Sequence, residues 1–88
     1  MWGYVNSSTP ARYVLRALRG QTMSVQLNTD DGYPARVTIS DAQGNFLGAA
    51  NRGELWSGSL AATQDYYVTV QAPADSAGDD FSLWISIR

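Results

Sequence analysis

The chain has 88 residues, with six basic and eight acidic side chains and a formal net charge of −2, and this length suits one small domain with a modest core. The absence of His, Cys and Lys excludes His-dependent nucleophilic catalysis, thiolate and disulfide chemistry, Cys/His metal centres, Schiff bases and a phosphate-loop lysine. The scattered arginines and mildly acidic balance disfavour nucleic-acid binding, and no apolar run is long enough to insert across a membrane.

Apolar and polar residues alternate along most of the chain, which is the period of a strand with one buried face. Strands are expected at residues 2–6, 13–18, 23–28, 35–40, 46–50, 55–60, 65–71 and 81–88. Turns are expected at 19–21 and 41–45, with longer loops at 28–34 and 72–80. Eight short strands joined in this way predict one all-β domain over residues 1–88. Its fold class is a small antiparallel β-sandwich of the jelly-roll or Greek-key kind.

The phase of the alternation separates buried from exposed aromatic residues. Four of them fall in phase with the core: Tyr13, Trp56, Tyr66 and Phe81. Tyr67 and Trp84 fall out of phase and should face solvent. If they share a sheet face, they would stack on a sugar ring or anchor a protein interface. Covering a neighbouring domain or protecting an edge strand are alternative roles. Gly58 should leave room for a bulky side chain from the opposite sheet.

If neighbouring strands run antiparallel, the connections fall alternately at the two ends of the sandwich. One end then collects residues 7–11, 28–34, 51–54 and 72–80, and the other collects 19–21, 41–45 and 61–64. Most of the acidic side chains fall at the first end. The candidate binding residues there are Asp30, Asp31, Tyr33, Asp79 and Asp80.

This acidic end has three interpretations. The simplest is that Asp forms turns and keeps the loops solvated. The second is that the acidic side chains meet a basic protein partner and speed its encounter. The third is a Ca²⁺ site, although the sequence has no Asp-x-Asp-x-Asp-Gly loop. No other metal or cofactor is expected.

Catalysis is disfavoured on physical grounds. Glu54 with an Asp would supply the two carboxylates of a glycoside hydrolase, but a small sandwich offers no deep cleft to perturb such a pair. Ser57 lacks the Gly-x-Ser-x-Gly spacing of a nucleophile elbow and has no His to activate it. We therefore expect a protein that is not an enzyme.

Three stretches carry a family resemblance: Tyr13-Val14-Leu15-Arg16-Ala17 with Gly20-Gln21-Thr22-Met23-Ser24-Val25, Trp56-Ser57-Gly58-Ser59-Leu60 with Ala62-Thr63-Gln64-Asp65-Tyr66-Tyr67-Val68-Thr69-Val70, and Phe81-Ser82-Leu83-Trp84-Ile85-Ser86-Ile87. Together they resemble the bacterial pre-peptidase C-terminal (PPC-like) β-sandwich domains. The same features occur in the related periplasmic inhibitors of g-type lysozyme. The resemblance spans roughly residues 5–87.

The resemblance implies an exported, non-catalytic β-sandwich of the periplasm, cell envelope or extracellular space, whose export signal is not among these residues. The first functional hypothesis is an accessory or binding module from a larger bacterial envelope or extracellular protein. Its partners would be the host protein's other domains, or an extracellular protein or polymer. One alternative is a g-type lysozyme inhibitor whose acidic loop end engages the basic enzyme. The other is a structural spacer domain.

Overall fold

The structure is a computed structural model that describes residues 2–6, 10–29, 35–72 and 78–88. It confirms the all-β class, and the described part holds no helix that could cross a membrane. The eight strands are β1 (Trp2–Val5), β2 (Ala11–Ala17), β3 (Thr22–Thr29), β4 (Arg36–Ser40), β5 (Phe46–Asn51), β6 (Leu55–Ser59), β7 (Gln64–Gln71) and β8 (Asp79–Ile87).

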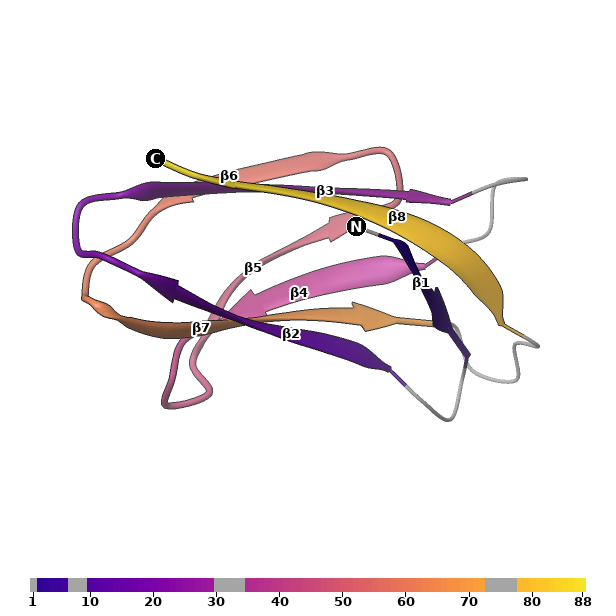
Figure 1. Cartoon of the computed structure of the whole chain (residues 1–88), viewed down its shortest axis with the longest axis horizontal. Helices are drawn as coiled ribbons and strands as arrows, with labels where there is room; N and C mark the ends of the chain where they lie inside the picture. Colours follow the sequence, from indigo (N-terminus) through magenta and orange to yellow (C-terminus); the bar gives the residue numbers. More distant parts are fainter. Residues whose placement is uncertain (1, 7–9, 30–34, 73–77) are drawn as a thin grey trace.

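The strands form two stacked antiparallel sheets of four, in the orders β1-β8-β3-β6 and β2-β7-β4-β5 (Figure 1). Each strand of the first half of the chain pairs with one from the second half: β1 with β8, β2 with β7, β3 with β6 and β4 with β5. This is the strand order of a jelly roll. The chain is therefore folded in half about the hairpin that joins β4 to β5.

That hairpin is fixed by the carboxylate of Asp41. Its Oδ1 accepts hydrogen bonds from the backbone N–H groups of Gln43 (3.0 Å) and Asn45 (2.8 Å), and its Oδ2 accepts one from the Asn45 side chain (3.0 Å). Gly44 supplies the positive φ of 84° that the turn requires. Desolvation acts to raise the pKa of Asp41, but these hydrogen bonds outweigh it and hold the pKa below its ordinary value.

The core lies between the sheets and confirms the predicted phase. Met23, Val25 and Leu27 of β3 are completely buried, and β1, β2, β4, β5, β7 and β8 each add at least one buried side chain to the core. Tyr66 and Phe81 are buried, while Tyr13 and Trp56 pack against the core from partly buried positions. The rings of Tyr13 and Phe81 meet edge to face across the two sheets, with centroids 6.5 Å apart.

Gly58 makes room for a bulky side chain, but that side chain comes from its own strand. A Cβ at Gly58 would lie 2.7 Å from Cζ2 of Trp56. The same indole lies across Gly48 of β5, where an added Cβ would overlap Nε1. The expectation of a partner from the opposite sheet was wrong for Gly58, because the glycine that faces Trp56 across the sandwich is Gly48. One indole thus closes the gap between β5 and β6.

We expect Gly48→Ala to destabilise the fold, because the new methyl group and the Trp56 ring need the same space. The cost should be about 1–3 kcal/mol in the free energy of unfolding, measured by urea denaturation. Ser59→Ala, on the exposed face of β6, is the matched control and should change it by less than about 0.5 kcal/mol. In a Trp56→Leu background the cost of Gly48→Ala should shrink, and an unchanged cost would contradict this explanation.

We expect Asp41→Asn to flatten the acid dependence of stability. Because the folded pKa is lowered, ionised Asp41 stabilises the fold above its unfolded pKa, and this stabilisation is lost as pH falls through the folded pKa. Between about pH 5 and about pH 2 the wild type should therefore lose more free energy of unfolding than the variant does. Urea titrations at each pH measure this, and parallel profiles would be evidence against the Asp41 interaction.

Candidate functional site

The predicted division of the connections between two ends is confirmed where they are described. At one end Gly20 N donates to Leu60 O (2.9 Å), and Arg19 N donates to Thr63 Oγ1 (2.9 Å). At the other end Gly53 N donates to Leu27 O (2.7 Å). This second end, at the right of Figure 1, is called the loop end below and comprises residues 6–10, 28–36, 51–54 and 71–80, as far as they are described.

The predicted acidic cluster is only partly placed by the structure. Asp30, Asp31 and Tyr33 lie outside the described residues. Asp79 and Asp80 belong to β8 and not to a loop, and they lie opposite Val5 and Tyr4 of β1. Asp80 is exposed where β8 begins. The sequence placed both residues in a loop because it does not reveal that β1 lies beside them. Pairing with β1 extends β8 to include them.

The turn at residues 51–54 is the best-defined part of the loop end. Asn51 N donates to Glu54 Oε1 (2.7 Å), and Glu54 N donates to Asn51 O (3.0 Å). The backbone N–H of Arg52 donates to Ala35 O (3.2 Å), and Gly53 takes a positive φ of 79°. The turn is thus tied to two neighbouring segments and presents the exposed side chains of Arg52 and Glu54. The sequence located this turn but did not single out Arg52.

A small, half-open cavity of about 190 Å³ lies at the loop end and is lined by Asn6, Pro10, Gln71 and Ala72. These four residues offer amides and apolar surface, and none of them has an ionisable or nucleophilic side chain. In the described part of the chain, His, Cys, Asp and Glu form no group of three that would hold a metal ion.

Tyr67 lies on the outer face of the sheet β2-β7-β4-β5. Its ring is half-buried, and the guanidinium of Arg12 sits over it at 5.2 Å from the centroid. The register places Val14, Tyr67, Ser40 and Phe46 in one row across the four strands. Phe46 is 66% exposed at the end of that row.

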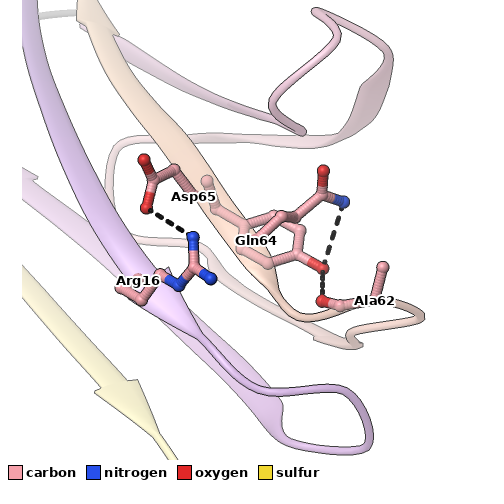
Figure 2. Close-up of polar contacts among 5 residues, drawn as sticks. Arg16, Ala62, Gln64 and Asp65 are labelled. Atoms are coloured by element: carbon pink, nitrogen blue, oxygen red, sulfur yellow. Dashed lines mark hydrogen bonds and ion pairs between the residues drawn. The ribbon is translucent and has the colours of Figure 1, made fainter.

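Three arginines from the strands share this outer face: Arg12, Arg16 and Arg36. Arg16 Nη1 lies 3.6 Å from Asp65 Oδ1 (Figure 2). Next to Asp65 in the same strand, Tyr66 is a core residue whose hydroxyl donates to Ala62 O (2.6 Å). With three arginines and one aspartate in its strands, this face has a net positive charge in a chain whose net charge is negative.

Trp84 lies on the other outer face, that of β1-β8-β3-β6, and is 49% exposed. The prediction that Trp84 faces solvent is therefore confirmed. Tyr67 and Trp84 do not share a sheet face. The structure therefore excludes a binding surface that contains both aromatic rings. The reason is that β7 and β8 belong to different sheets, and the outward sides of the two sheets point in opposite directions.

The chain has the fold of a known lysozyme inhibitor. The crystal structure of Aeromonas hydrophila PliG, a periplasmic inhibitor of g-type lysozyme, matches it with a TM-score of 0.80 and 25% sequence identity. The match covers 100% of this chain and 83% of the PliG chain. No protein-family model matches the chain, and no curated protein does.

The whole of this chain therefore shares its architecture with most of the PliG chain. The comparison supports the resemblance to periplasmic lysozyme inhibitors, whereas no family model supports the PPC-like assignment. Because PliG is an inhibitor and not an enzyme, the comparison also favours a non-catalytic protein.

We expect Glu54→Ala to loosen the turn at residues 51–54 while the sandwich stays folded. The variant leaves Asn51 N without its carboxylate acceptor, so amide hydrogen exchange should accelerate at residues 51–53. The amide of Gly20 at the opposite end is the internal reference and should exchange as in the wild type. Glu54→Gln keeps an acceptor oxygen and should restore most of the protection. Equal exchange in all three proteins would show that Glu54 does not hold the turn.

Proposed function

We propose that this chain is a non-catalytic protein inhibitor of g-type lysozyme. The observation that carries the proposal is the match to PliG over the whole chain, at 25% identity and a TM-score of 0.80. The partner is then a g-type lysozyme, and the periplasm in which PliG works is the proposed location.

We place the contact with the enzyme at the loop end. The sandwich measures 38 × 22 × 17 Å, so its ends are its narrowest parts and the ones that fit a groove. A glycosidase holds its polysaccharide substrate in such a groove between two carboxylates. The turn at residues 51–54 is already fixed by hydrogen bonds, so little conformational entropy is lost when it binds.

The charges at the loop end support the same placement. Arg52 suits a carboxylate inside a glycosidase groove, because guanidinium and carboxylate form strong paired hydrogen bonds. Glu54 and Asp80 suit a basic rim around that groove, as do the acidic residues Asp30, Asp31 and Asp79 that the sequence assigns to this end. The acidic loop end of the sequence-based hypothesis is thus kept and gains Arg52.

We expect the wild-type chain to inhibit a g-type lysozyme and to form a complex with it in the absence of substrate. The triple variant Arg52→Ala/Glu54→Gln/Asp80→Asn should weaken both effects by about tenfold or more, because it removes the charges and keeps the turn. Raising the ionic strength from about 0.05 M to about 0.5 M should weaken binding of the wild type as well. Turbidity of a peptidoglycan suspension reports inhibition, and calorimetry without substrate reports the complex.

Phe46→Ser is the matched control, because Phe46 is exposed on an outer sheet face away from the loop end and should leave inhibition unchanged. Complex formation without substrate separates an inhibitor of the enzyme from a protein that merely masks the polysaccharide. If the chain neither binds nor inhibits the lysozyme, even at low salt, the proposal is refuted. The accessory module then becomes the preferred hypothesis again.

A further inference from the structure

The two outer faces of the sandwich differ sharply in charge. The face of β2-β7-β4-β5 carries Arg12, Arg16, Arg36 and Asp65. On the other sheet, the outward residues between the ends of β8 are uncharged, and the charged ones, Asp80 and Arg88, lie at the start of β8 and just beyond its end. The uncharged outward residues, read from the alternation with the buried positions, are Thr22, Ser24, Gln26, Asn28, Leu55, Ser57, Ser59, Ser82, Trp84 and Ser86.

The strand register arranges this neutral face in rows. Trp84 of β8, Gln26 of β3 and Leu55 of β6 lie side by side in one row. Trp84 is 49% exposed and Leu55 is 59% exposed. The next row holds only serines, Ser86, Ser24 and Ser57, about 7 Å further along the strands. A flat aromatic ring, an amide and a band of hydroxyls therefore lie within reach of one another.

The serine hydroxyls are held in place. Ser24 Oγ and Ser57 Oγ share a hydrogen bond of 2.5 Å across β3 and β6. Ser86 Oγ accepts a hydrogen bond from Arg88 Nε at 3.2 Å. Each hydroxyl has one donor and two acceptor positions, so every serine keeps capacity for a ligand. The band is thus a fixed set of neutral donors and acceptors.

We propose that this neutral face binds an uncharged glycan strand, with a sugar ring stacked on the indole of Trp84. A sugar ring has a face of C–H bonds, which packs on an exposed aromatic ring, and a rim of hydroxyls, which need both donors and acceptors. Gln26 and the serine band supply both kinds of group. In the row of Trp84, Gln26 and Leu55 a charged polymer would lose its hydration without meeting a counter-charge, because Arg88 and Asp80 lie beyond that row, beside Ser86 and opposite Tyr4.

A second aromatic residue extends the platform. Tyr4 of β1 is 55% exposed and lies opposite Asp80, four positions before Trp84 on β8. The separation along the strand is about 13 Å, which suits a chain of several sugars better than a single sugar. Gly78 packs so closely against the Tyr4 hydroxyl that a Cβ at residue 78 would overlap it, so the ring is held in place.

This inference goes beyond the proposed function and does not depend on it, because glycan binding requires no lysozyme. If both hold, they are related in purpose, since the substrate of a lysozyme is itself a glycan strand. The platform uses β3, β6 and β8, whereas the enzyme contact is placed at the loop end. Each binding event therefore has its own residues and its own assay.

The test is a titration of the ¹⁵N-labelled full chain with chitohexaose and with cellohexaose, without lysozyme. Binding of either sugar should shift the indole N–H of Trp84 and the amides of β3 and β8. Trp84→Ala should weaken binding by about tenfold or more, and Gln26→Ala should weaken it less. Salt at about 0.5 M should leave binding unchanged, because no ion pair contributes.

Phe46→Ser again serves as the matched control, since Phe46 is an exposed aromatic residue on the opposite outer face. It should bind the sugars as the wild type does. The dispersion of each variant's spectrum shows that it is folded, and Gln26→Ala tests the platform without removing an aromatic ring. The proposal is overturned if neither sugar shifts the spectrum at about 10 mM, or if the shifts map to Arg12 and Tyr67. Binding of polygalacturonate in place of the neutral sugars would overturn it too.

Discussion

The structure depends on one constraint: the chain folds back on itself at residues 41–45, and each half is paired almost entirely with the other. Asp41 holds that hairpin through three hydrogen bonds from Gln43 and Asn45. The strand pairs are nested about this hairpin, from β4 with β5 next to it to β1 with β8 at the chain ends of the described structure. Contacts of such wide sequence separation are costly to close, so most of the fold's stability must come from the core that the pairing creates.

The same constraint determines where function can lie. The hairpin at residues 41–45 lies at the same end of the sandwich as the connections 19–21 and 61–64, and the four other connections of the antiparallel chain fall at the loop end. Residues 51–54 are held there by Leu27 and Ala35, which come from the ends of separate strands. A turn anchored to both sheets moves with the sandwich as one rigid body. Such a turn suits an inhibitor that enters a groove, because little conformational entropy is lost on binding.

The sequence predicted the strands, the inward positions and the two ends, because all three follow from the period of two and from turn residues. It did not predict which strands share a sheet. For that reason it left open whether Tyr67 and Trp84 share a face, and they lie on opposite ones. Asp79 and Asp80 were assigned to a loop although β1 pairs with them. Trp56 folds over Gly58 of its own strand and Gly48 of the other sheet, a contact that alternation alone does not specify.

Two surfaces of a rigid body can act together without sharing residues. The loop end presents Arg52 and Glu54 along the long axis of the sandwich, whereas Trp84 faces outward from the flank of one sheet. A glycan strand on that flank therefore leaves the loop end free. Weak binding to a polymer raises the local concentration of whatever the protein carries, and the gain depends on both sites being usable at once. An inhibitor with both surfaces would be localised on the polymer that its target enzyme attacks. The neutral flank would bind the polymer and leave the loop end free for the enzyme.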